Sequence, residues 1–142
     1  MIMHAKHAVD LHEAAFSGNT EMLQLLLDQG QDPNSTTAYG QTALHRAAMN
    51  GNLDCTKILI GRGAQTHTQD QAGCTPLHYA AGNGHLVLVK WLIHEAGVSL
   101  MPQSKKERTP RVFAKRNGHS KVVVFLAEME NKQAGFPWLG SS

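Results

Sequence analysis

The chain has 142 residues, of which 42% are hydrophobic and 17% charged, and its formal net charge is +2. This length fits one domain, and the apolar content is sufficient for a buried core. Two cysteines, Cys55 and Cys74, provide neither a disulfide framework nor a paired metal-ligand spacing, which favours a reducing compartment. No apolar run suits a signal sequence or a membrane span, so we expect an intracellular protein, cytoplasmic or nuclear, or one delivered into a host cell.

Charge is distributed unevenly along the chain. Residues 1–100 carry five Lys or Arg against eight Asp or Glu, a net of −3, whereas residues 101–142 carry eight against three, a net of +5. The basic excess gathers in Lys105, Lys106, Arg108, Arg111, Lys115, Arg116 and Lys121. Such a cluster attracts acidic or phosphorylated partners or nucleic acid, although a solvated capping face is the plainer interpretation.

Four related segments follow one another at a spacing of 33 or 34 residues. They are Val9–Ala15, Thr42–Ala48, Thr75–Ala81 and Thr109–Lys115. The first three share a Leu, a His and a pair of Ala, and every segment is trailed by a glycine, at Gly18, Gly51, Gly84 and Gly118. Repetition at this period indicates a solenoid of stacked units.

Each unit predicts two helices. In the third unit, Thr75 suits the N-cap, Pro76 the first helical position and Gly84 the left-handed residue after the helix. A second apolar run of helical spacing then follows in every unit, around residues 22–27, 55–60, 88–93 and 122–127. Because the Ala pairs let the first helices approach closely while the second helices are bulkier, we expect the stack to curve around a concave inner face.

The pattern Gly-x-Thr-Pro-Leu-His-x-Ala-Ala with a trailing Gly-His resembles the ankyrin repeat. The resemblance covers residues 5–130 and implies an all-α ankyrin-repeat solenoid of stacked helix–turn–helix units with short β-turn finger loops. We expect one domain with repeats at 5–39, 40–72, 73–106 and 107–130, and a flexible tail at 131–142. The fourth repeat departs from the motif, because Arg111, Val112 and Glu107 replace its Leu, His and Gly. A polar residue suits a terminal cap, and a ligand-binding role is the alternative for Arg111.

Histidines and cysteines are the candidates for chemistry. The nine histidines suggest metal, yet His12, His45 and His78 share one motif position, which the ankyrin resemblance makes structural. The others do not supply the three or four converging ligands that a metal site needs. Cys74 and His78 imitate an activated thiolate, but no third group orients the histidine as a base. We therefore predict no cofactor, no metal and no enzyme, with a metal or thiol protein as the remote alternative.

Protein recognition is the function that the resemblance implies. Ankyrin partners meet the finger tips and the exposed side of the inner helices, where this chain carries side chains that its repeats do not share. Aromatic residues and arginine dominate interface hot spots. The predicted partner-binding residues are Tyr39, Gln41, Arg46, Met49, Asn50, Gln71, Cys74, Tyr79, Asn83, Arg108, Phe113 and Arg116.

We accordingly expect a monomeric, non-catalytic adaptor, scaffold or inhibitor that binds another protein. The alternative assigns binding to the basic fourth repeat, with an acidic or phosphorylated partner ranking above nucleic acid. The aromatic segment Phe136–Leu139 either folds back on the last repeat or serves as a docking peptide.

Overall fold

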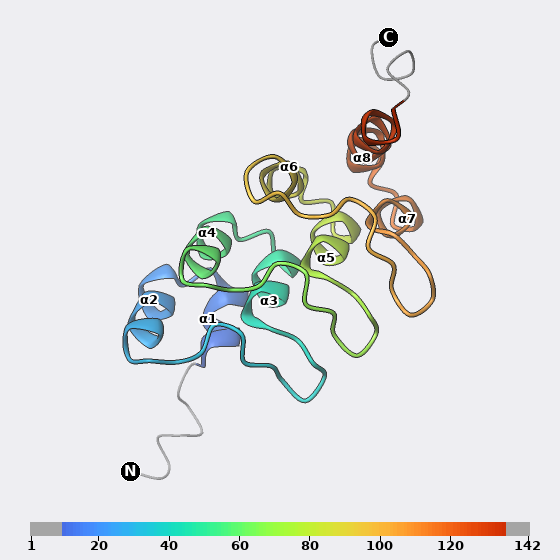
Figure 1. Cartoon of the computed structure of the whole chain (residues 1–142). Helices are drawn as coiled ribbons and strands as arrows, with labels where there is room; N and C mark the ends of the chain where they lie inside the picture. The colour runs from blue at the N-terminus through green and yellow to red at the C-terminus, as the bar shows by residue number, and fades with distance from the viewer. Residues whose placement is uncertain (1–9, 136–142) are drawn as a thin grey trace.

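The computed structural model describes residues 10–135, which form eight helices in two rows (Figure 1). The inner row contains α1 (Leu11–Ser17), α3 (Ala43–Met49), α5 (Pro76–Gly82) and α7 (Pro110–Arg116). The outer row contains α2 (Thr20–Asp28), α4 (Leu53–Gly61), α6 (Leu86–His94) and α8 (Ser120–Gln133). Within residues 10–135 there is no strand, and the predicted all-α repeat solenoid is confirmed.

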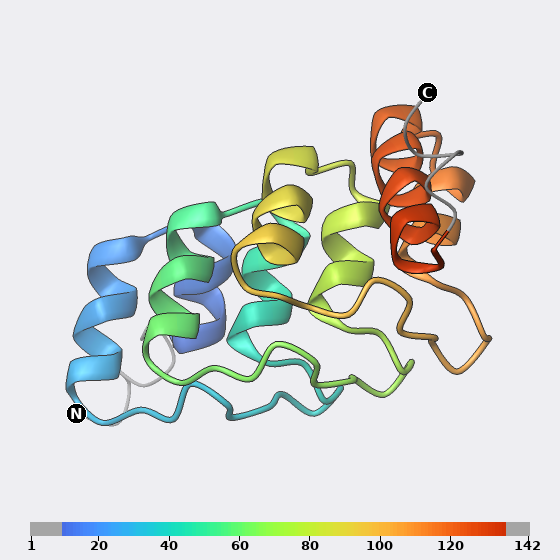
Figure 2. The same cartoon turned by 45° about the horizontal axis from the view of Figure 1, so that its top comes forward.

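Small residues allow the inner helices to pack closely. Helix α3 packs between α1 and α5, and α5 packs in turn against α7. The paired alanines of the motif, including Ala47 and Ala80, are completely buried along these contacts, so one helix backbone can approach the next. Figure 2 shows the consequence: the helices stand side by side, and the long fingers between units extend below them, at the same end of successive helices.

The core lies between the two rows. Leu23, Leu44 and Leu59 belong to a cluster formed by the first two units, and Leu88 and Leu126 belong to a second one formed by the later units. Cys55 is completely buried in the first cluster, where it acts as a small apolar side chain. No unit has a core of its own, so each depends on its neighbour.

The motif histidines connect neighbouring units. The ring Nδ1 of His78 accepts from the backbone N–H of Thr75 at 2.9 Å, and its Nε2 lies 2.8 Å from the carbonyl oxygen of Arg108 in the next finger. His45 repeats this arrangement, with Nε2 2.8 Å from the carbonyl of Cys74. Burial lowers the pKa of both rings, so they stay neutral, with Nε2 as the donor.

The backbones of neighbouring fingers are also joined. The N–H of Gln71 donates to the carbonyl of Tyr39 at 3.0 Å, and the N–H of Lys105 donates to that of Ala72 at 2.9 Å. Gly73 lies at the second contact with φ +78°, and a Cβ there would lie 2.6 Å from the backbone nitrogen of Lys105. Only glycine meets both demands, the left-handed backbone and the close approach.

The fourth unit closes the stack differently from its predecessors. Glu107 occupies the left-handed position of the motif glycine, with φ 60°. The Arg111 Nε–H donates to both carboxylate oxygens of Glu130, at 3.0 and 3.1 Å, which holds the end of α8 against α7. Helix α8 runs to Gln133, so residues 131–133, which the sequence analysis assigned to a flexible tail, are helical. The aromatic segment Phe136–Leu139 lies outside the described residues.

Among the described residues, no helix combines the length and the apolar character that crossing a membrane requires.

The close approach at Gly73 predicts that replacement by alanine costs more stability there than at Gly118. Gly73 and Gly118 share φ +78°, but a Cβ on Gly118 would meet open space. Replacement by alanine therefore imposes the same left-handed strain of about 1 kcal/mol at both positions, while Gly73→Ala adds overpacking of about 1–3 kcal/mol. Urea unfolding of the two variants measures the difference. Equal losses in the free energy of unfolding would contradict the finger contact.

Candidate functional site

One motif position supplies a line of unshared side chains along the inner helices. It is held by Glu13 in α1, Arg46 in α3, Tyr79 in α5 and Phe113 in α7. Glu13 is exposed and the other three are half-buried, whereas the histidines that precede Arg46 and Tyr79 are fully buried. We call these four residues the variable row. The buried neighbours maintain the frame. Glu13 and Arg46 line one hollow with the finger from Thr37 to Gln41, and Phe113 lines another with Arg108. We call the side of the inner helices that carries these two hollows the groove.

Tyr79 is held in place by a buried carboxylate. Its hydroxyl donates to Asp70, which is only 7% exposed and accepts also from the N–H of Cys74 at 2.9 Å and from Gln41 Nε2 at 3.4 Å. Burial alone would raise the pKa of Asp70, but these hydrogen bonds outweigh it and the pKa is lowered. Burial and the neighbouring carboxylate raise the pKa of Tyr79. An ionised Asp70 thus anchors a neutral phenol.

Arg46 lies beside the largest of the groove's hollows. Its guanidinium carbon is 4.8 Å from the centre of the Phe16 ring, a cation–π contact. The hollow of about 470 Å³ is bounded by Arg46, by the finger from Thr37 to Gln41, and by Asp10, His12 and Glu13 at the start of α1. The Nε of Arg46 is buried and has no hydrogen-bond acceptor among the described residues. An unsatisfied buried donor of this kind is costly to the fold.

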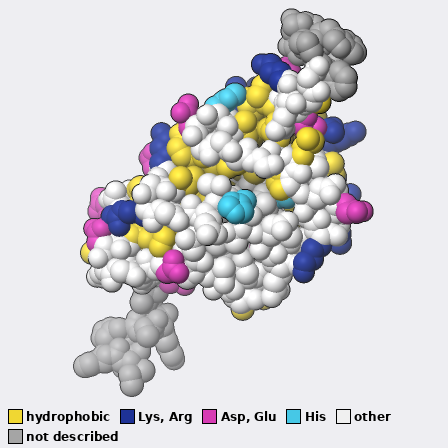
Figure 3. All heavy atoms as spheres, in the orientation of Figure 1, with side chains coloured by type: hydrophobic (Ala, Val, Ile, Leu, Met, Phe, Trp, Pro, Cys, Tyr) yellow, Lys and Arg dark blue, Asp and Glu magenta, His cyan; other side chains and the backbone are white. Residues whose placement is uncertain are grey.

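A smaller hollow lies at the other end of the groove. Arg108, Phe113, Arg116 and Asn117 line its volume of about 160 Å³. The Phe113 ring packs edge-on against His78 at 4.9 Å, and Gly82 leaves room for it, since a Cβ there would lie 3.3 Å from the ring. Basic side chains are visible along the side of the molecule that carries the last unit (Figure 3).

The arginines of the groove differ from Arg62 and Arg111 in their ion-pair partners. Within residues 10–135 the ion pairs are Arg62 with Asp28 and Arg111 with Glu130. Both paired arginines lie away from the groove, at the end of α4 and between α7 and α8. Among the described residues no carboxylate pairs with Arg46, Arg108 or Arg116.

Several predicted binding residues also serve the frame. The Nδ2 groups of Asn50 and Asn83 each donate at 2.8 Å to a carbonyl of the preceding unit, those of Phe16 and Met49 respectively. Gln71 Nε2 donates to the carbonyl of Ala38 at 2.8 Å. Cys74 is 3% exposed, so its side chain offers a partner almost no surface. Tyr39, by contrast, is 70% exposed at a finger tip.

Asp70 is the residue of this region that sequence reasoning missed. The sequence contained a signal for this role, because an Asp two residues before a tight Ala-Gly turn accepts hydrogen bonds from the N–H groups of the turn. The Oδ1 of Asp70 does so, accepting from Ala72 at 3.0 Å as well as from Cys74.

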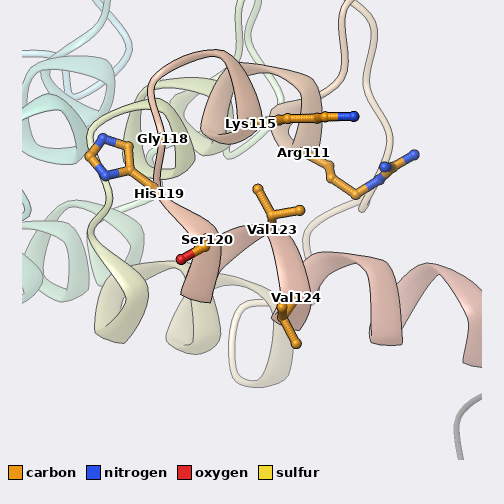
Figure 4. A pocket seen from close by; sticks show the side chains of 7 residues that line it. All are labelled: Arg111, Lys115, Gly118, His119, Ser120, Val123 and Val124. Carbon is orange, nitrogen blue, oxygen red and sulfur yellow. The ribbon is translucent and has the colours of Figure 1, made fainter.

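Both cysteines are buried, and each lies in a different helix unit. Burial raises the pKa of Cys74, and nearby Asp70 raises it further, so the thiol stays protonated. Among residues 10–135, no three His, Cys, Asp or Glu side chains converge as a metal site would require. Another hollow, of about 280 Å³, opens at the end of the stack between Arg111, Lys115, Val123 and Val124 (Figure 4).

Comparison with known families supports this description. The chain matches the family described as Ankyrin repeats (3 copies) over residues 11–103. It belongs to the ankyrin-repeat family. The match ends before α7 and α8, where the motif degenerates, yet the structure continues the stack through that fourth helix pair. A search among curated proteins found no match.

The Asp70 anchor predicts the effect of removing one hydroxyl. Tyr79→Phe should lower the free energy of unfolding by about 1–2 kcal/mol, because a hydrogen bond to an ionised carboxylate is lost from a half-buried site. Tyr39→Phe is the matched control, since that ring is exposed at a finger tip. Thermal and urea unfolding compare the two. A Tyr79→Phe variant as stable as Tyr39→Phe would contradict the anchor.

Proposed function

We propose that this protein acts by non-catalytic protein–protein recognition, as an adaptor, scaffold or inhibitor. Ankyrin repeats are generally protein-interaction modules, and the family supports this class of function without naming a partner. The proposed interface comprises the variable row with the finger residues beside it. Its principal contact residues are Tyr39, Gln41, Arg46, Met49, Tyr79, Arg108, Phe113 and Arg116.

One observation carries the proposal most directly. Arg46 and Tyr39 line the same hollow of about 470 Å³, and Tyr39 is 70% exposed. The residues of the frame, such as His45, are instead buried and hydrogen-bonded on both sides. Arginine and tyrosine are also the residue types on which interfaces most depend.

The proposal extends to the cellular compartment, the oligomeric state and the class of partner. Two free, buried cysteines suit a reducing intracellular compartment, and we propose that the protein acts there as a monomer. A second candidate function places binding on the basic fourth unit, whose Arg108 and Arg116 lack carboxylate partners among the described residues. An acidic or phosphorylated protein fits those charges, and nucleic acid ranks below it because Phe113, the ring beside them, already packs on His78.

Paired variants test the interface. A partner is first identified by affinity capture, purified, and titrated against Tyr39→Ala/Arg46→Ala. We expect affinity to fall about tenfold or more, because both side chains are large and face the groove. Gln24→Ala/Val87→Ala is the matched control, with both positions exposed on outer helices α2 and α6. Equal affinity of the two double variants would contradict the proposed interface.

A further inference from the structure

Two arginines of the fourth unit, Arg108 and Arg116, occupy positions that are neutral in the two units before it. In the second and third units these positions hold Gln41 and Met49, then Cys74 and Gly82. Both of those units form the same helix pair without the charges, so the fold does not require an arginine at either position. The two charges are therefore available for a ligand.

Both arginines border one hollow of the fourth unit. Its volume is about 160 Å³, and it is lined by Arg108, Phe113, Arg116 and Asn117. Within residues 10–135 neither arginine forms an ion pair. Glu107 precedes Arg108 in the finger, but it is exposed and does not line the hollow. The described lining residues thus supply two guanidinium groups and no acidic group.

Hydrogen bonds of the frame hold the walls of this hollow. The backbone N–H of Arg108 donates to Ser104 Oγ at 3.3 Å, and the carbonyl oxygen of Arg108 lies 2.8 Å from His78 Nε2. At the end of α7, Asn117 Nδ2 donates to the carbonyl of Gly82 at 2.6 Å. The two backbone segments that carry the arginines are therefore fixed in place, which reduces the entropy lost when a ligand binds between them.

A phosphate group fits this pair of arginines better than a carboxylate does. At pH 7 a phosphorylated serine or threonine carries a charge of about −1.5 to −2 and three strong acceptor oxygens. It can therefore accept hydrogen bonds from both guanidinium groups at once, whereas a carboxylate carries one charge and is fully used by one arginine. The Phe113 ring borders the same space and suits the carbon atoms of the phosphorylated side chain.

The surroundings of the hollow favour a phosphorylated protein over nucleic acid. Residues 1–100 carry five Lys or Arg against eight Asp or Glu, and the hollow near Arg46 is lined by Asp10 and Glu13. A polyanion that extends from the fourth unit along the inner row would meet this negative charge. Proteins that bind single strands also present aromatic rings for the bases, whereas Phe113 already packs edge-on against His78 at 4.9 Å.

We propose that the hollow between Arg108 and Arg116 binds a phosphorylated serine or threonine side chain of a partner protein. The two guanidinium groups bind the phosphate oxygens, and Phe113 packs against the carbon atoms of the bound side chain. This inference rests on the second candidate function, because it assigns a ligand chemistry to the fourth unit. Recognition by the fourth unit then depends on phosphorylation of the partner.

Fluorescence anisotropy tests the site. The probe is a fluorescein-labelled peptide whose only charged side chain is a central phosphoserine, titrated with the full chain. Arg108→Gln and Arg116→Gln should each weaken binding about tenfold, because each removes one charged donor. Lys121→Gln is the matched control, because it removes the same charge from an exposed residue of the same unit outside the hollow. Its effect should stay below about twofold, since salt screens a charge that does not contact the ligand.

Two further probes separate the classes of ligand. The same peptide with glutamate in place of phosphoserine should bind about tenfold more weakly. Single-stranded RNA of similar length should also bind more weakly than the phosphopeptide. Absence of phosphopeptide binding, equal binding of the glutamate peptide, tighter binding of RNA, or equal losses in Lys121→Gln and the arginine variants would each overturn the inference. Circular dichroism of each variant establishes that the helices are intact.

The outcome separates this inference from the broader function. If Tyr39→Ala/Arg46→Ala weakens binding of a captured partner while the phosphopeptide does not bind, the proposed interface stands and this inference fails. If the phosphopeptide binds through the two arginines while the captured partner is insensitive to Tyr39→Ala/Arg46→Ala, binding belongs to the fourth unit. If neither the captured partner nor the phosphopeptide responds to its variants, both statements fail.

Discussion

Stacking of one unit on the next is the constraint on which this structure depends. No helix pair here has a core of its own, and the buried clusters extend across units. The ring nitrogens of His45 and His78 fix the orientation of one unit on the next. Each ring bonds both to the start of its own helix and to a carbonyl of the following finger. Helix starts and fingers are thereby held in a constant relation from unit to unit.

A constant frame makes the remaining positions available for recognition. The variable row recurs once per unit, and its side chains are oriented by contacts that differ from one unit to the next. Asp70 anchors Tyr79, Phe16 supports Arg46, and His78 with Gly82 seats Phe113. Such preorganisation reduces the entropy lost when a partner binds. Within the part of the chain that the structure describes, Arg46, Arg108 and Arg116 form no ion pair with a carboxylate.

The repeat period predicts most of this fold, and the reason is local. Caps, prolines, glycines and apolar spacing all act within one unit, so the helices follow from the chain itself, whereas the structural role of His45 and His78 is implied by the ankyrin resemblance. Contacts between units do not follow in this way: nothing in the spacing indicates that Asn83 bonds to Met49 or that Arg46 lacks an acceptor. The pairing of Arg111 with Glu130 is likewise a contact between two helices that the spacing does not indicate.

The most direct test of the account observes the arginine side chains themselves. In a ¹⁵N-labelled sample, the five Nε–Hε resonances report separately on the three groove arginines and on Arg62 and Arg111. On addition of a purified partner, the account predicts that the resonances of Arg46, Arg108 and Arg116 shift while the two already paired with carboxylates stay in place. Shifts confined to Arg62 and Arg111, or none at Arg46, would contradict it.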